Sequence, residues 1–151
     1  MSDVGSHRLD LLAWWFGLPH RVVSDMGTRT HAYEAEDSAT ALMTFHDRIP
    51  CTLSFQWNSK AWADELHIIG TEASVTFSPL DNNEMTFTRG SESTRAYYAR
   101  PDNAHFALID DFAKAICTGE SPRFNAEDGL AATLIADRMA QSSVSSAWVE
   151  N

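Results

Sequence analysis

The pattern of apolar and polar positions changes its period twice along the chain. Residues 3–16 are apolar at helical spacing and more hydrophobic than a surface helix would be. Gly17 suits the position that ends a helix, and Pro19 follows two residues later. The first segment is therefore predicted to be a mostly buried helix with a well-marked end.

Apolar and polar residues alternate through the middle of the chain. In the stretch CTLSFQW, which begins at Cys51, every second residue is apolar and the others are small and polar. This period of two is typical of strands with one buried face. Turn-forming stretches separate the segments, so we expect about seven strands with short connections in an antiparallel arrangement. The expected strands cover residues 20–32, 37–46, 50–58, 64–70, 73–78, 84–89 and 94–99.

Helical spacing returns in the last third, over residues 103–118 and 126–142, and AWVEN predicts a short final strand. Strands segregated from helices are typical of the α+β class. We expect one domain over residues 1–151: an open, mainly antiparallel sheet of about 6–8 strands with helices packed on one face, and no Rossmann domain. The other face is rich in Thr, Ser, Gln and Asn, and it meets either water or another subunit.

Composition narrows the possible partners. The net charge of −10 argues against nucleic acid and against an anionic membrane surface. No apolar run approaches the ~20 residues that span a bilayer. The two cysteines, Cys51 and Cys117, lack metal-type spacing and are predicted to be small buried residues in a reducing cytoplasm. The five tryptophans are predicted to lie mostly in the core.

The first candidate for chemistry is the pair Asp3 and His7. Their i, i+4 spacing places both on one face of the first predicted helix, near its N-terminus. There the helix dipole and the carboxylate act in opposite directions on the protonation of His7. A histidine that changes charge near neutrality suits a general acid or base. The alternative is that Asp3 only caps the helix and His7 is an ordinary exposed histidine.

Three other residues are weaker candidates for substrate binding. His105 begins a predicted helix, where a ligand can bind, and Trp57 and Trp62 flank a loop and could line a pocket. The remaining histidines fit strand or turn positions. The sequence has no metal-ligand spacing, no G-x-G-x-x-G, no P-loop and no G-x-S-x-G. We therefore expect neither a metal nor a bound nucleotide cofactor in this chain.

Four segments, in order, carry a resemblance to a known family. DVGSHRLDLLAWWFG resembles the D-x-G-x-H-x-x-D segment, with its apolar helix and glycine, of the Gfo/Idh/MocA oxidoreductases, which include glucose–fructose oxidoreductase and inositol dehydrogenase-like enzymes. EDSATALMTFHDRIPCTLSFQW, LHIIGTEASVTF and LIDDFAKAICTGESPRFNAEDGLAATLIADRMAQSS are similar to that family's paired strands, hairpin and terminal helices. Ala73 stands where the family usually has glycine, which puts the hairpin's turn geometry in question.

The resemblance implies the second half of a two-part enzyme. In the family, an N-terminal Rossmann domain binds NAD or NADP and supplies a catalytic lysine, and this chain resembles only the C-terminal domain. Carried over, His7 is the general base for a hydroxyl of a sugar, polyol or related compound, and Asp3 orients that histidine or the substrate. In the family, the sheet face often forms the interface between subunits, so the resemblance implies a homo-oligomer. The lysine is missing and hydride chemistry needs the nicotinamide, so we expect the isolated chain to be inactive.

Two other interpretations stay open at this point. The chain could be a stand-alone binding or oligomerisation module that has lost the chemistry. It could also be a small hydrolase or isomerase that uses Asp3 and His7 unaided. Neither the substrate nor the choice between NAD and NADP follows from these residues.

Overall fold

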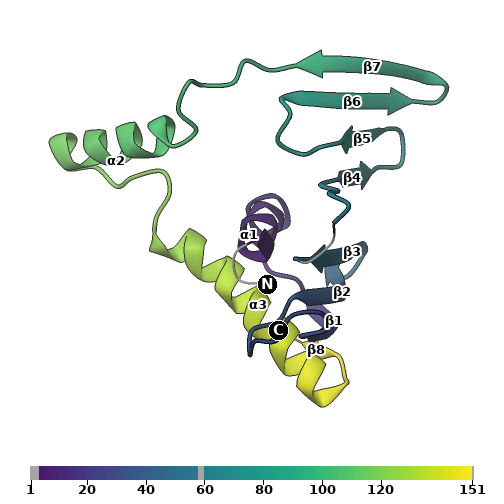
Figure 1. The fold of residues 1–151 in the computed structure, drawn as a ribbon. Helices are drawn as coiled ribbons and strands as arrows, with labels where there is room; N and C mark the ends of the chain where they lie inside the picture. Colours follow the sequence, from purple (N-terminus) through teal and green to yellow (C-terminus); the bar gives the residue numbers. More distant parts are fainter. Residues whose placement is uncertain (1–3, 58–59, 151) are drawn as a thin grey trace. The chain divides into compact units, whose positions relative to one another are not determined.

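The computed structural model describes residues 4–57 and 60–150 and divides the chain into two compact units. The first unit comprises Met1–Ser59 and Ser121–Asn151, and the second comprises Lys60–Glu120. Figure 1 shows the elements of each unit. The first holds α1 (Val4–Phe16), β1 (Arg21–Gly27), β2 (Ser38–Phe45), β3 (Ile49–Gln56), α3 (Ala126–Ser145) and β8 (Val149–Glu150). The second holds β4 (Leu66–Ile69), β5 (Ser74–Phe77), β6 (Glu84–Arg89), β7 (Glu92–Tyr97) and α2 (Phe106–Thr118).

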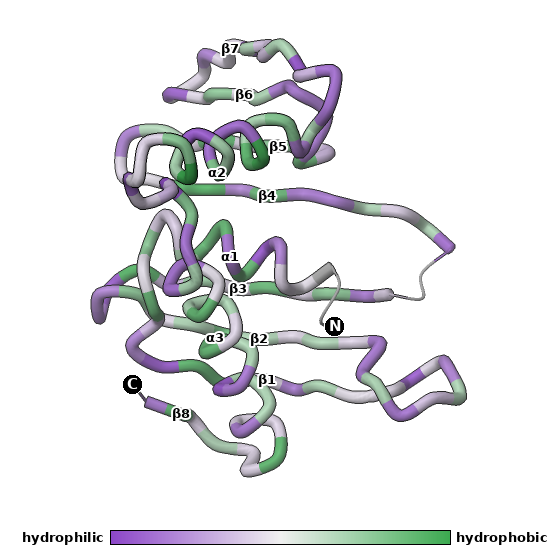
Figure 2. Tube along the Cα trace, turned by 90° about the vertical axis from the view of Figure 1, so that its left-hand side faces the viewer, coloured by the Kyte–Doolittle hydropathy of each residue, from purple (hydrophilic) through white to green (hydrophobic). Residues whose placement is uncertain are grey.

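The first unit is a four-stranded antiparallel sheet with two helices on one face. Its strand order is β3-β2-β1-β8. The hydrophobic segments of α1 and α3 pack against β1 and β2, and Figure 2 shows these segments in green. The buried core side chains are Leu9, Leu12, Val22, Ala39, Ala41, Met43, Phe45, Ala132, Ile135 and Met139. Burial of the inward side chains explains why β2 and β3 alternate as the sequence predicts.

Serines of α3 complete the hydrogen bonding of β1. β8 pairs with only Arg21 and Val22 of that strand. Beyond this point, Ser24 N–H donates to Ser142 Oγ at 3.0 Å and Met26 N–H donates to Ser143 Oγ at 2.9 Å. Because buried backbone donors need partners, these two hydroxyls fix α3 along the strand.

The prediction of a strand over residues 20–32 is wrong at its C-terminal end, because the observed strand is shorter. The strand ends early because of one buried carboxylate. β1 stops at Gly27, and a loop occupies residues 28–36. Asp37, only 1% exposed, accepts hydrogen bonds from the backbone N–H groups of Arg29, Thr30 and His31 at 2.8–2.9 Å. These donors are thereby removed from strand pairing, and the loop is held in place.

The second unit contains an antiparallel meander in the order β4-β5-β6-β7, followed by α2. At the turn between β4 and β5, Gly70 N–H donates to Ala73 O at 2.8 Å, so alanine closes the turn at the position where the family usually has glycine. α2 ends at Gly119, whose φ of 75° and N–H bond to Ala115 O match the predicted helix end. The helix begins at Phe106 rather than at residue 103.

The α+β class, the antiparallel pairing and the short final strand are confirmed. The strands form two sheets of four. The predicted burial of the tryptophans is wrong for Trp14, Trp57, Trp62 and Trp148, which are between 44% and 73% exposed. Trp148, for example, is not in the core: the Arg21 guanidinium lies over its ring, 4.6 Å from the ring centroid. Cys117 is also exposed, as are most residues of α2; Cys51 is half-buried.

Candidate functional site

His7 lies in the first turns of α1, beside a hollow between α1 and α3. Leu9 and Leu12 hold α1 on the core, which leaves His7 on the solvent side of the helix with an exposed imidazole. The hollow has a volume of about 450 Å³. It is lined by Ser6, His7, Asp10, Gly129, Ala132, Thr133 and Ala136. The residues that α3 contributes to this lining are mostly small, so they leave space for a ligand beside the imidazole.

Asp10 is the acidic neighbour of His7 within the described part of the chain. It follows His7 by three residues on the same helix, so both side chains share a face and line the same hollow. The side chains of His7 and Asp10 make no hydrogen bond to any of the described residues. Both groups therefore have their hydrogen-bonding atoms available to a ligand.

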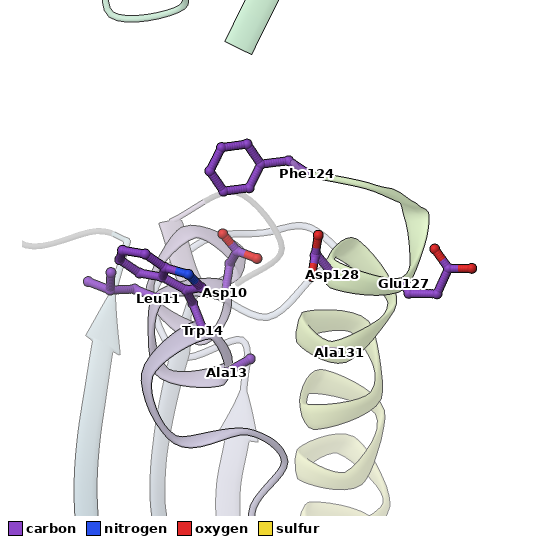
Figure 3. A pocket seen from close by; sticks show the side chains of 8 residues that line it. All are labelled: Asp10, Leu11, Ala13, Trp14, Phe124, Glu127, Asp128 and Ala131. Atoms are coloured by element: carbon purple, nitrogen blue, oxygen red, sulfur yellow. The ribbon is translucent and has the colours of Figure 1, made fainter. Parts of the chain in front are cut away.

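A second hollow, of about 260 Å³, lies further along the same two helices. Figure 3 shows the ring of Trp14 beside Asp10, with Phe124 above the carboxylates of Asp10 and Asp128, while Glu127 points away. Trp14 is 69% exposed and Phe124 is 49% exposed. The lining is completed by Leu11, Ala13 and Ala131. Two aromatic faces and two carboxylates are thus presented to one space.

The start of α3 holds Asp128 in this arrangement. The Asn125 side chain accepts from the N–H groups of Glu127 and Asp128, and the Asp128 carboxylate accepts from Asn125 N–H at 2.9 Å. This reciprocal capping box fixes the carboxylate at the helix N-terminus. There the helix dipole stabilises its negative charge.

The charged residues that line the two hollows are acidic. Their lining residues include three carboxylates and one histidine, and no lysine or arginine. Among residues 4–57 and 60–150, no group of three or more His, Cys, Asp or Glu side chains could hold a metal ion. No helix in the same described ranges combines the length and the apolar character needed to cross a bilayer.

The predicted site residues fall in different places. His7 lies in the first unit, and Asp3 lies outside the described residues. Trp57 follows β3 and donates its backbone N–H to Asp37 O at 2.9 Å, and it does not line either hollow. Trp62 and His105 belong to the second unit. Of the three weaker candidates, only Trp57 lies in the same unit as His7, and it lines neither hollow.

Sequence reasoning assigned no role to Asp10, Trp14, Phe124 or Asp128. Asp10 could have been found, because its spacing from His7 places both on one helix face. Phe124 and Asp128 carry no such signal. They come close to Trp14 only because α3, near the other end of the chain, packs against α1.

Comparison with known proteins identifies the family to which this chain belongs. Residues 1–150 match the oxidoreductase C-terminal alpha/beta domain of the Gfo/Idh/MocA type, and the chain belongs to that family. No curated protein gives a significant match. The resemblance inferred from the four sequence segments is thereby confirmed.

Solved structures of oxidoreductases share the fold at low identity. An aldose-aldose oxidoreductase from Caulobacter crescentus complexed with glycerol is 18% identical, with a TM-score of 0.85 over 99% of this chain and 46% of that one. An oxidoreductase from Agrobacterium radiobacter in complex with NAD+, L-tartaric acid and magnesium is 14% identical, with a TM-score of 0.84 over 98% and 48%. Levoglucosan dehydrogenase in complex with NADH and levoglucosan is 19% identical, with a TM-score of 0.81 over 98% and 49%. The chain thus spans about half the length of these structures.

Proposed function

We propose that this chain is the substrate-side half of an NAD(P)-dependent oxidoreductase, in which His7 accepts the proton from a hydroxyl of a sugar or polyol. The observation that carries the proposal is the exposed imidazole of His7 in the hollow between α1 and α3, within a domain of this family. The support for the substrate class comes from relatives whose structures contain glycerol or levoglucosan.

The chemistry assigned to this chain is proton transfer and substrate orientation. Oxidation of a secondary alcohol removes a proton from oxygen and a hydride from carbon, and leaves a carbonyl. A neutral imidazole accepts the proton and becomes imidazolium. Asp10 would accept a hydrogen bond from a neighbouring hydroxyl, which orients the substrate at His7. When bound, a nicotinamide cofactor would supply the hydride acceptor.

The described residues of this chain do not fit the dinucleotide itself. A pyrophosphate needs backbone N–H groups at a glycine-rich turn or positive side chains. Both hollows present carboxylates instead. We therefore assign the cofactor to a separate dinucleotide-binding domain, in keeping with relatives that are about twice as long and whose structures contain NAD+ or NADH. The isolated chain is accordingly proposed to be inactive.

Asp3 is proposed to orient His7. It precedes His7 by four residues, which is one helical turn, so a helix that includes it would place its carboxylate on the same face as the imidazole. A carboxylate in that position stabilises the imidazolium formed during the reaction. Its own location lies outside the described residues.

The outer face of the β1–β3 sheet is proposed to join copies of this chain. Leu42, at the centre of β2, is 47% exposed and is flanked across the strands by Val23 and Thr52. An exposed leucine beside a valine and a threonine suits a subunit contact. Sedimentation of the 151-residue chain should show a species larger than the monomer, and Leu42→Lys should shift it toward the monomer.

A second candidate is a binding or oligomerisation module without catalysis. It is favoured by the lack of a fit for the dinucleotide in the described residues. The two functions differ in one respect: only the first requires His7 to act on a substrate.

The experiment is an assay of NAD+ or NADP+ reduction by the polypeptide in which this chain accompanies a dinucleotide-binding domain, with a panel of sugars and polyols. Turnover of at least one of these substrates is expected, and His7→Ala should lower kcat about 10²–10⁴-fold. The matched control is His20→Ala, because His20 is also exposed but lies outside both hollows. No turnover of any panel member would favour the module without catalysis.

A further inference from the structure

The two hollows beside α1 meet at a single residue. Asp10 lines both the hollow that contains His7 and the hollow that contains Trp14 and Phe124. We call the combined space the α1–α3 groove. Its two volumes, about 450 and about 260 Å³, together fall within the roughly 300–1,000 Å³ of typical ligand sites. The groove therefore has the volume to hold a ligand larger than the group reacting at His7.

The Trp14 end of the groove has the chemistry of a carbohydrate subsite. Trp14 and Phe124 are exposed, and the ring of Trp14 and the face of Phe124 that Arg123 does not cover can pack against the C–H faces of a sugar ring. The carboxylates of Asp10 and Asp128 are acceptors for its hydroxyl groups. Asp128 uses Oδ2 to accept from Asn125 N–H, and its second oxygen remains available to a ligand in this geometry.

The charge of the groove restricts the ligand further. Its lining contains no lysine or arginine, whereas Asp10, Glu127 and Asp128 contribute three negative charges. A phosphate or carboxylate on the ligand would be repelled by these carboxylates. The Arg123 guanidinium, which is not among the lining residues, lies over the Phe124 ring, 5.7 Å from its centroid. A ring that carries only hydroxyl groups avoids this repulsion.

The His7 end has room for a first ring. Gly129 of α3 forms part of its wall, and a Cβ added to this glycine would meet no atom within 4 Å. Thr133 Oγ1 donates to Gly129 O at 3.2 Å, which directs that hydroxyl proton to its own helix and leaves the threonine oxygen as a further acceptor.

We propose that the α1–α3 groove is a two-part site for a neutral carbohydrate of more than one ring. The first ring lies at His7, the second stacks between Trp14 and Phe124, and Asp10, at the junction, accepts hydroxyls from both. Asp10 is thus a specificity-determining residue, and the acidic lining excludes phosphorylated and carboxylated sugars. The proposal rests on the proposed function only for the reaction of the first ring; binding of the second ring needs neither cofactor nor catalysis.

The test is calorimetric titration of the 151-residue chain with cellobiose, maltose and sucrose, each compared with glucose, glucose 6-phosphate and cellobionate. At least one disaccharide should bind about tenfold more tightly than glucose, and neither anion should bind measurably. Trp14→Ala should reduce the disaccharide to the affinity of glucose. Trp148→Ala is the matched control that should leave both affinities unchanged, because Trp148 lies outside the groove. Circular dichroism checks that each variant is folded.

Two results would overturn the proposal: no disaccharide binding more tightly than glucose, or a disaccharide preference that survives Trp14→Ala. Asp10→Asn should let cellobionate bind, and its continued exclusion in that variant would overturn the assigned role of Asp10. These failures are distinguishable from failure of the proposed function. If His7→Ala keeps full turnover while Trp14 still governs disaccharide binding, the proposed catalysis fails and the binding site stands.

Discussion

Asn125 and Asp128 cap each other at the first turn of α3. The Asn125 Oδ1 accepts from Asp128 N–H at 3.2 Å, and the Asp128 carboxylate accepts from Asn125 N–H at 2.9 Å. Two backbone donors that the helix itself cannot satisfy are thus paired by two side chains three residues apart. The same contact holds the Asp128 carboxylate toward the groove.

Removing this cap should therefore affect both stability and ligand binding. Asn125→Ala leaves two N–H groups at the helix start without their acceptor, and it should lower the free energy of unfolding by about 1 kcal/mol. Urea denaturation measures the change. Asn125→Asp, which keeps an acceptor at the cap, should lose much less; an equal loss in both variants would show that the cap contributes little.

Two glycines should respond to alanine in opposite directions. Gly129 is inside α3, and an added Cβ would meet no atom within 4 Å, so Gly129→Ala should stabilise the protein by about 0.5–1 kcal/mol. Gly119 ends α2 with a φ of 75°, and Gly119→Ala should destabilise by about 1 kcal/mol or more.

Thermal unfolding of the two variants tests this contrast directly. Because Gly129 lines the hollow at His7, its substitution should also weaken glucose binding without loss of stability. Destabilisation by Gly129→Ala would contradict the open space assigned to that position.

Asp37 should be among the residues to which stability is most sensitive. Asp37→Ala removes a buried acceptor from three backbone N–H groups, and it should cost roughly 3 kcal/mol. Asp37→Asn keeps one acceptor oxygen and should cost less. Hydrogen exchange at residues 29–31 provides the local measurement, since these amides should exchange faster in the alanine variant; unchanged protection there would contradict the role of Asp37 in holding the loop.

The two cysteines should differ in reactivity. Burial raises the pKa of the Cys51 thiol, so less of the reactive thiolate is present at a given pH, whereas Cys117 is exposed on α2. A thiol reagent at mildly alkaline pH should modify Cys117 first, and the rate at Cys51 should rise as the pH approaches its raised pKa. Mass spectrometry of partially labelled protein identifies the site; faster labelling of Cys51 would contradict the burial.

The parts of the fold that follow local patterns could be predicted from the sequence. Gly17 ends α1 with a positive φ, as its position before Pro19 indicates, and the alternation from Cys51 onward identifies β3. The end of β1 could not be predicted in this way. A single aspartate in the stretch EAEDSA gives no sign that it will be buried and will bind three backbone groups of the preceding loop.

The candidate site, too, could be predicted from the sequence only in part. His7 and Asp10 lie on one helix, and their spacing alone places them on one face. The aromatic end of the groove depends on how α1 packs against α3, which is a tertiary contact between distant parts of the sequence. The pattern of Trp14 also suggests a core position, since an apolar side chain in a strongly apolar helix is usually buried. Its exposure beside Asp10 becomes evident only from the fold.

The central claim, that His7 accepts the substrate proton, is tested most directly by chemical rescue. Turnover by His7→Ala is measured in the polypeptide with its dinucleotide-binding domain, with and without added imidazole. The hollow beside His7 is open and lined by small residues of α3, so a free imidazole could take the place of the missing side chain. We predict a loss of about 10²–10⁴-fold in kcat that imidazole partly restores. Turnover of the variant within about twofold of the unmodified protein would contradict the claim.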